Sequence, residues 1–193
     1  MSSFNYYAVF KPYDMLSQFS GEPTDRLLGD LHVFPNDVYP VGRLDKDSEG
    51  LLLLTNDNRF KTTLLSPISK ISKTYLVQVD GEITQDAIDK LSDGTITIKH
   101  KGKEHQVLPA ECRIVDPPAE LPDRSIPIRY RKNIPTSWIE LTITEGKNRQ
   151  VRKMTAAVGF PTLRLIRIGI GEYRITQFTH KNVWTFDPTQ IIR

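Results

Sequence analysis

A short charged segment directly before a run of four leucines holds the residues best suited to chemistry. Arg43 and Asp45 lie two positions apart within residues 42–50, Gly-Arg-Leu-Asp-Lys-Asp-Ser-Glu-Gly, and the leucines occupy 51–54. Four consecutive leucines are expected in the core, so they hold the preceding carboxylate at a defined place. A carboxylate fixed beside a cation can act as a nucleophile or as an acid–base group. The segment therefore predicts a functional site and not a solvated loop.

A basic segment later in the chain offers a partner for this carboxylate. A carboxylate buried alone has a raised pKa and loses its charge, so a nearby cation is expected. Residues 146–154, Gly-Lys-Asn-Arg-Gln-Val-Arg-Lys-Met, predict a turn followed by a helix from about Arg149 to Val158. Arg149 and Arg152 stand about one helical turn apart and project from a similar face. The alternative is an amphipathic helix with a solvated basic face.

Positive charge is concentrated in the C-terminal half of the chain. The net charge is only +3, yet Glu172 is the single acid between Lys147 and Arg174. Local basic density attracts a phosphate backbone, although a solvated basic face is the simpler alternative. The basic residues are Lys147, Arg149, Arg152, Lys153, Arg164, Arg167 and Arg174, with a second group at Arg124, Arg129, Arg131 and Lys132.

The apolar pattern predicts more strands than helices. Helices are expected at 58–65, capped by Asn56, at about 84–94, and at 149–158. Strands are expected at 6–10, 51–54, 73–79, 95–98, 112–115, 138–144 and 163–170, with a charged turn at 99–104 and a long surface loop at 117–135. Several strands follow one another too closely for crossover helices. The prediction is an α+β fold in one domain, 1–193, with a mixed, largely antiparallel sheet, flanking helices and two lobes around a central active-site cleft.

The composition excludes several classes of protein. A single cysteine, Cys112, excludes an intrachain disulfide and a cysteine-based zinc site. His100 and His105 are expected in a surface loop and not in a metal site. No apolar run approaches the ~20 residues needed to cross a bilayer, and the N-terminus lacks the regions of a signal peptide. The expectation is a cytoplasmic protein with no membrane association.

Residues 42–57, GRLDKDSEGLLLLTND, resemble the catalytic segment of the RNA pseudouridine synthases, in the branch typified by the small-subunit ribosomal enzyme. Three further segments are similar to elements of that family and occur in the same order: Lys73-Thr-Tyr75, Glu145 to Met154, and Leu165-Ile-Arg167. Lys11-Pro12 resembles the family's first motif, with Phe10 in place of the usual Asn. The resemblance extends from Tyr7 to about Trp184.

The resemblance implies a role for each matched residue. Asp45 corresponds to the catalytic carboxylate, Tyr75 to the residue that stacks on uracil and moves a proton, and Arg152 to the cation that pairs with the catalytic Asp. Arg43 either supports Asp45 or enters the RNA stack in place of the flipped base. The remaining substrate-binding residues are then Leu165, which packs against the site, with Lys73, Arg149 and Arg167.

The family's reaction follows from the same resemblance. It implies the pseudouridine synthase catalytic fold and isomerisation of one uridine in a stem-loop of large-subunit (23S) ribosomal RNA, by base flipping, glycosidic cleavage, base rotation and rejoining through carbon. No metal and no organic cofactor are expected. The first motif begins at Lys11, which leaves no room for the small N-terminal RNA-binding domain common in this branch. A monomer is expected, acting on free RNA or on a ribosomal assembly intermediate.

Two other classes of function are compatible with parts of the sequence. A non-catalytic RNA-binding or assembly factor would keep the fold, but it has no need of an electrostatically costly group such as Asp45, Tyr75 and Arg152. A nucleoside or glycoside hydrolase would pair Asp45 with a second acid across the scissile bond. Asp47 and Glu49 lie too close to Asp45 in sequence to suggest that pair.

Overall fold

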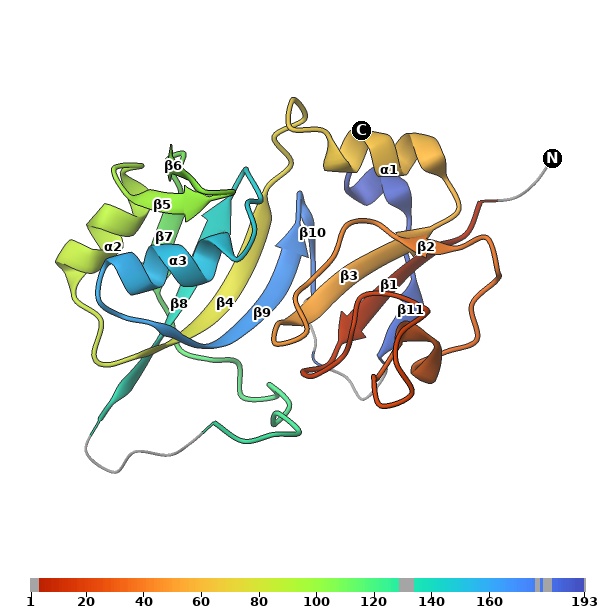
Figure 1. Cartoon of the computed structure of the whole chain (residues 1–193), viewed down its shortest axis with the longest axis horizontal. Coiled ribbons are helices and arrows are strands. Elements are labelled where there is room, and N and C mark those ends of the chain that lie inside the picture. The colour runs from red at the N-terminus through yellow and green to blue at the C-terminus, as the bar shows by residue number, and fades with distance from the viewer. Residues whose placement is uncertain (1–3, 129–133, 176–177, 179–181, 193) are drawn as a thin grey trace.

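The computed structural model describes residues 4–128, 134–175, 178 and 182–192. Within these residues the chain forms a nine-stranded sheet, a separate two-stranded hairpin and three α-helices (Figure 1). The strands are β1 (Tyr6–Lys11), β2 (Tyr39–Pro40), β3 (Glu49–Thr55), β4 (Lys73–Asp80), β5 (Thr97–His100), β6 (Lys103–Gln106), β7 (Glu111–Ile114), β8 (Thr136–Ile143), β9 (Thr162–Ile170), β10 (Tyr173–Arg174) and β11 (Val183–Thr185). The α-helices are α1 (Asn58–Leu65), α2 (Gln85–Ser92) and α3 (Gln150–Ala157). The predicted α+β fold with a mixed sheet is confirmed.

The main sheet has two halves that meet between β3 and β9. Its order is β11-β1-β3-β9-β4-β8-β7, with β2 beside β3 and β10 beside β9. The β3–β9 pair is parallel and has only two register pairs, Glu49 with Ile166 and Gly50 with Arg167, whereas the other described pairs are antiparallel. Figure 1 shows these two strands side by side at the centre of the molecule. The junction is therefore short, and it lies immediately after the segment that carries Asp45.

Gly50 is required at this junction. A Cβ added there would lie 2.2 Å from the backbone oxygen of Arg167, and the φ of Gly50 is +99°. An L side chain would meet both a backbone clash and an unfavourable conformation. A glycine here lets β3 and β9 approach closely enough to pair.

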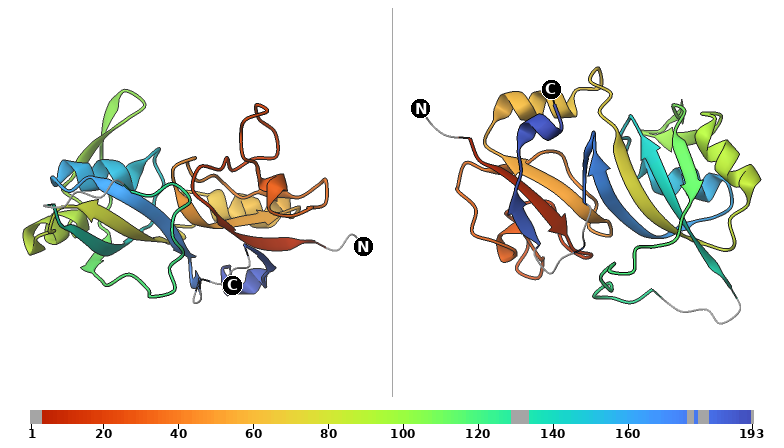
Figure 2. Two further views of the ribbon diagram at one scale, coloured as in Figure 1. Left: turned by 90° about the horizontal axis from the view of Figure 1, so that it is seen from below. Right: turned by 180° about the vertical axis from the view of Figure 1, so that it is seen from behind.

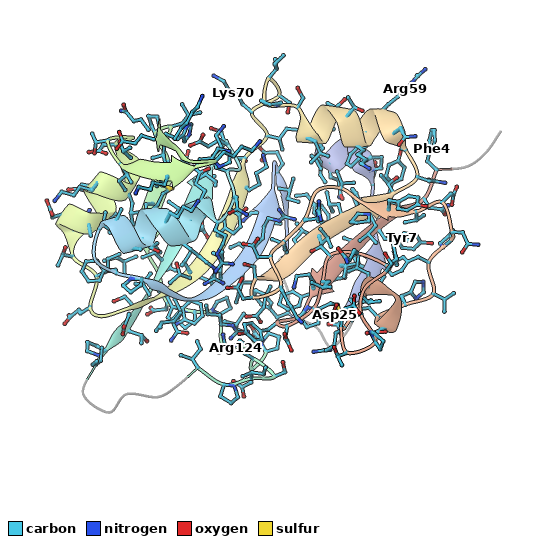
Figure 3. The ribbon with its side chains drawn as sticks, in the orientation of Figure 1. Phe4, Tyr7, Asp25, Arg59, Lys70 and Arg124 are labelled. Carbon is cyan, nitrogen blue, oxygen red and sulfur yellow. The ribbon has the colours of Figure 1, made fainter. Side chains whose placement is uncertain are left out.

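A buried ion pair crosses the same junction. Arg164 donates to both carboxylate oxygens of Glu49, at 2.9 and 2.8 Å, and also to the backbone oxygen of Pro122 at 2.7 Å. Two residues after Pro122, the Arg124 guanidinium lies over the Tyr13 ring, 4.1 Å from its centre. Arg124 lies at the lower edge of the molecule in Figure 3. Residues 122–124 therefore contact β9 and the segment that follows β1.

The core lies on both faces of the sheet. Helices α2 and α3 pack on one half of it, where the largest apolar cluster includes Val77, Leu91 and Met154. On the other half, Leu52 and Leu54 face the segment at 12–40, and Leu51 and Leu53 face α1. Figure 2 shows α3 and the 12–40 segment on the same side of the sheet. The alternation along β3 therefore supplies two separate cores, as a strand buried on both faces must.

Most predicted elements are present, with two local corrections. The helix at 58–65 has the predicted bounds, but its cap is Asp57 and not Asn56, because the Asp57 carboxylate accepts from the N–H groups of Arg59 and Phe60. Asn56 Oδ1 accepts from the Asn5 N–H instead. Helix α3 starts at Gln150, one residue after the predicted start.

The charged segment at 99–104 was predicted to be a turn, and this was wrong. It forms most of the β5–β6 hairpin, and only Lys101 and Gly102 make the turn, both with positive φ. His100 and His105 therefore lie on paired strands and not in a surface loop. The described part of the predicted loop, 117–128, contains no helix or strand, in agreement with the prediction. Residues 129–133, which include Arg129, Arg131 and Lys132, lie outside the described residues.

Candidate active site

Asp45 lies in the connection between β2 and β3, in a segment that we call the Asp45 loop (residues 43–47). The loop is held by backbone contacts to other segments. The Lys46 carbonyl accepts from the Asp14 N–H at 2.9 Å and from Lys11 Nζ at 3.5 Å, and the Asp47 carbonyl accepts from Arg152 Nη2 at 2.7 Å. The Asp45 side chain is 35% exposed. It is thus a fixed carboxylate that remains open to solvent, whereas the sequence predicted a buried one.

Arg149 is the cation that forms an ion pair with Asp45 among the described residues. Its Nη1 lies 3.5 Å from Asp45 Oδ2. The same guanidinium donates two hydrogen bonds to the Asp47 carboxylate, at 2.9 and 2.7 Å. These bonds to Asp47 raise the pKa of Arg149. Asp47 thereby holds the Arg149 side chain beside Asp45.

Arg152 contacts Asp47 and not Asp45. Its Nη2 donates to the Asp47 carbonyl and lies 3.4 Å from Asp47 Oδ2. Burial lowers the pKa of Arg152, and the negative charges of Asp47 and Asp45 oppose that shift. Arg152 thus acts on Asp45 through its charge and through the backbone of the loop. The direct Arg152–Asp45 pair implied by the family resemblance is replaced here by an Arg149–Asp45 pair.

Asp47 was missed as a functional residue when only the sequence was considered. Burial acts to raise its pKa, but the hydrogen bonds from Arg149 and the charge of Arg152 outweigh burial and lower the pKa. The sequence did contain a signal for Asp47: it is a second carboxylate two residues after Asp45, and the later basic segment offers two arginines, Arg149 and Arg152. Where two carboxylates and two arginines meet, each arginine is expected to interact with both carboxylates.

Lys11, the last residue of β1, also anchors the Asp45 loop. Its side chain is fully buried, and its Nζ donates to the carbonyl oxygens of Pro12 at 2.9 Å and Met15 at 2.8 Å, in addition to Lys46. Burial lowers the pKa of Lys11 to about 8, against the nearby charges of Glu49, Asp47, Asp14 and Asp45. A buried ammonium bonded to several carbonyls is fixed in place, so Lys11 joins β1 to the loop.

Tyr75, Arg167 and Gly50 occupy one row across the sheet. Tyr75 on β4 stands opposite Arg167 on β9, and Arg167 stands opposite Gly50 on β3. Tyr75 is 9% exposed and packs within the cluster beneath α3, to which Leu165 also belongs. The sheet thereby places Tyr75 and Leu165 on the face that carries α3, the helix whose arginines contact the Asp45 loop.

The other predicted substrate-binding residues lie in two different environments. Arg167 is buried and donates through Nε to the Leu51 carbonyl at 2.8 Å, while its Nη2 is buried without a hydrogen-bond partner among the described residues. Burial lowers the pKa of Lys73, and the charge of Arg167 adds to that effect. Arg43 is exposed. The structure therefore brings Arg149 and Arg152 to the Asp45 loop, fixes Arg167 in the sheet, and leaves Arg43 open to solvent.

A second polar network supports the start of α3. Glu145 accepts from Gln150 Nε2 at 2.6 Å and from the Leu108 N–H at 3.0 Å, and it pairs with His105 Nε2 at 2.8 Å. Burial acts to raise the pKa of Glu145, but these hydrogen bonds lower it. Because Arg149 immediately precedes Gln150, this network fixes the orientation of the helix end that faces Asp45.

The described part of the chain contains no group of three or more histidine, cysteine, aspartate or glutamate side chains placed to hold a metal ion. None of its helices is long and apolar enough to cross a membrane. Burial raises the pKa of the Cys112 thiol to about 12, so this cysteine is not an activated nucleophile. Around Asp45, the described residues bring together two carboxylates, Asp45 and Asp47, and two guanidinium groups, those of Arg149 and Arg152.

The chain is similar to known proteins over most of its length. Residues 5–157 match the model of the RNA pseudouridylate synthase family. The chain is 48% identical over 167 residues to ribosomal large subunit pseudouridine synthase E of Xanthomonas axonopodis pv. citri, covering 86% of this chain and 85% of the relative. It is 42% identical over 185 residues to the protein of the same name from Xanthomonas campestris pv. campestris, covering 95% of each.

A solved structure shows the same fold. The crystal structure of a pseudouridylate synthase superimposes with a TM-score of 0.77 at 22% identity, covering 98% of this chain and 73% of the other. The predicted resemblance to pseudouridine synthases is thereby confirmed. With the family model matching most of its length, the chain belongs to the RNA pseudouridylate synthase family.

Proposed function

We propose that this protein converts a uridine of large-subunit ribosomal RNA to pseudouridine. The relatives from two Xanthomonas species bear that activity in their names. The observation in this chain that carries the proposal is the Asp45 carboxylate, 3.5 Å from Arg149 and carried by a loop whose backbone is bonded to Lys11, Asp14 and Arg152. A fixed, charge-compensated carboxylate suits attack on a nucleotide and cleavage of its glycosidic bond.

The proposed reaction begins when the target uridine leaves its helix, because its reacting atoms are inaccessible while the base is stacked. Asp45 then acts as the essential carboxylate. The C1′–N1 bond breaks, the freed uracil turns, and a C1′–C5 bond forms. The proton on C5 is then lost and N1 takes up a proton, so that the product is an isomer of uridine. Arg43, which is exposed and two residues before Asp45, enters the position that the base vacates.

The remaining residues have supporting roles in this proposal. Arg149 pairs with Asp45 directly, and Arg152 fixes the loop that carries it. Tyr75 stacks on the uracil and moves a proton, and Leu165 packs beside it. Lys73, two residues before Tyr75 on β4, and Arg167, opposite Tyr75 on β9, provide positive charge near that residue.

The substrate binds through charge as well as through the site. Exposed basic residues lie in the Asp45 loop, at Arg43 and Lys46, and directly before α3, at Arg149. We infer a single-domain monomer that works in the cytoplasm, without a metal or an organic cofactor, on free RNA or on an assembly intermediate. Affinity for RNA is expected to fall as salt rises, because bound counterions are released when phosphates are neutralised. A salt-independent affinity would contradict this part of the proposal.

The test is release of tritium from C5-labelled uridine in large-subunit ribosomal RNA. The parent protein is compared with Asp45→Asn, which removes the charge but keeps the shape, and with Asp86→Asn as a control. Asp86 is an exposed carboxylate on α2 that pairs with Lys90, so its loss changes net charge equally and leaves the site intact. We expect release by the parent and by Asp86→Asn, and none by Asp45→Asn.

Other outcomes separate the rival functions. Free uracil without pseudouridine would indicate a hydrolase. RNA binding without tritium release, on both naked RNA and immature ribosomal particles, would indicate a non-catalytic RNA-binding factor. Full activity of Asp45→Asn would remove Asp45 from the mechanism while leaving the reaction itself established.

A further inference from the structure

Ser17 makes two hydrogen bonds to the residue that precedes Asp45. Its hydroxyl donates to the Leu44 carbonyl at 2.8 Å and accepts from the Leu44 N–H at 3.0 Å. Ser17 is 4% exposed and Leu44 is 8% exposed, so neither backbone group is open to bulk water. One buried hydroxyl thus supplies both the donor and the acceptor that a neighbouring strand would provide to a residue.

The Ser17 side chain is itself held in place. Met15, two residues earlier, is fully buried, and its carbonyl accepts from Lys11 Nζ at 2.8 Å. On the other side, the Gln18 carbonyl accepts from the Leu28 N–H at 3.1 Å. The hydroxyl is therefore attached to a segment that is anchored on both sides, which is required if it is to fix a second segment.

Different residues hold the Asp45 loop before and after Asp45. The contacts described above hold Lys46 and Asp47, which follow the carboxylate, through Lys11, Asp14 and Arg152. Before it, Leu44 is held by Ser17. We propose that Ser17 is a positioning residue for Asp45, resting on the proposed role of Asp45 as the essential carboxylate. It fixes the backbone from which the carboxylate projects, without touching the substrate.

The expected effect is on the chemical step and not on RNA binding. Reacting atoms must stand within a few tenths of an ångström of the productive geometry, and a displacement of about 1 Å can cost about 100-fold in rate. Removing the Ser17 hydroxyl leaves two buried backbone groups of Leu44 unpaired, so the loop will shift to reach water or another partner. RNA affinity comes mainly from basic side chains that Ser17 does not contact.

Ser48 provides a matched control. It is also a buried serine, directly after the Asp45 loop, and its Oγ has no hydrogen-bond partner among the described residues. Ser48→Ala and Ser17→Ala therefore each delete one buried hydroxyl oxygen. Of these two oxygens, the one of Ser17 makes the hydrogen bonds to Leu44. Ser17→Cys keeps a weak donor and acceptor in nearly the same shape and serves as the conservative variant.

The experiment measures single-turnover pseudouridine formation and RNA affinity separately, with folding checked by circular dichroism at the assay temperature. We expect Ser17→Ala to lower the single-turnover rate about tenfold or more with RNA affinity within about twofold of the parent, Ser17→Cys to be intermediate, and Ser48→Ala to match the parent. Should Ser17→Ala not fold, the Ser17→Cys rate against the Ser48→Ala rate decides.

Three results would overturn the inference: an unchanged rate in the Ser17 variants, equal losses in the Ser17 and Ser48 variants, or a loss that lies entirely in RNA affinity. The proposed function is tested separately by the parent. A parent that forms no pseudouridine refutes the function before Ser17 is considered, whereas an active parent with indifferent Ser17 variants refutes only the positioning role.

Discussion

Arg149 Nη1 lies 3.5 Å from Oδ2 of Asp45, and the same guanidinium is bonded twice to Asp47. Arg149 holds this place with a backbone φ of +53°, a left-handed conformation that few residues other than glycine and asparagine adopt readily. A strained residue at a site persists only where its surroundings require it. The two carboxylates and the start of α3 together meet that requirement.

Replacing Arg149 by Asn separates charge from backbone strain. Asn tolerates the left-handed conformation, which offsets part of the stability lost with the two bonds to Asp47, so Arg149→Asn should lower the melting temperature less than Asp47→Asn does. Loss of the cation beside Asp45 should lower kcat/KM by about 10- to 100-fold. Arg149→Lys keeps the charge but not the bidentate hydrogen bond to Asp47, and we expect its kcat/KM to lie between those of the parent and Arg149→Asn. Parent-like kinetics for Arg149→Asn would leave Arg152 as the functional partner of Asp45.

Asp47 should make stability depend on pH at the acid end. Burial acts to raise its pKa, but its bonds to Arg149 and the charge of Arg152 lower it overall, below that of an unfolded aspartate. A carboxyl with a lowered folded pKa contributes stability above about pH 4, and the contribution is lost as the pH falls through the folded pKa. Asp47→Asn should therefore be less stable than the parent at neutral pH, and the difference should shrink on acidification. Calorimetric melting between pH 6 and pH 3 measures this; a difference that does not change with pH would contradict it.

Lys11 should make stability depend on pH at the alkaline end, and here too the stability should rise with pH. Burial lowers its pKa to about 8, whereas the unfolded lysine titrates near 10.5. Between these values the unfolded chain binds more protons than the folded chain, so the free energy of unfolding rises with pH, by at most about 3 kcal/mol. Lys11→Met lacks this group. Urea unfolding of both proteins at pH 7.5 and pH 10 should show the stability of the parent increasing relative to Lys11→Met.

The elements were largely predictable from the sequence, because their signals are local. Four leucines can only be buried, and Leu51 to Leu54 form the centre of β3. Ser66-Pro67 ends α1 where predicted, since the residue before a proline disfavours helix. The β5–β6 hairpin was missed because its charged residues hid the strand pattern, although Lys101-Gly102 suits a tight hairpin turn.

The partners within the site were not predictable in the same way. Asp45 was singled out because its neighbours in sequence mark it. The choice between Arg149 and Arg152 depends on how α3 docks against a loop more than 100 residues away, as the Arg149–Asp47 separation of 102 residues shows. The sequence around residues 149–152 contains no pattern that predicts how α3 docks against the loop. The role of Ser17 was hidden for the same reason, since its partner Leu44 lies 27 residues farther along the chain.

Gly50 should tolerate no side chain. Gly50→Ala would place a Cβ 2.2 Å from the Arg167 oxygen at a φ of +99°, so β3 and β9 must separate. We expect a loss of about 3 kcal/mol or more in the free energy of unfolding, or failure to fold. Gly29→Ala is the control, because a Cβ there has nothing within 4 Å and no positive φ is found. Similar unfolding midpoints for the two variants would show that the β3–β9 junction is not rigid.

The β3–β9 junction also has a consequence for protein synthesis. The bond from Arg167 to Leu51 joins residues 116 positions apart, and β9 is inserted between β3 and β4, both of which are made much earlier. Contacts of such separation form late, because the intervening chain must first be closed into a loop. On the ribosome, β3 and β4 must therefore wait until β9 has emerged from the exit tunnel. The sheet around the Asp45 loop cannot be completed before β9 is made, so a newly made protein gains its site only after that strand has emerged.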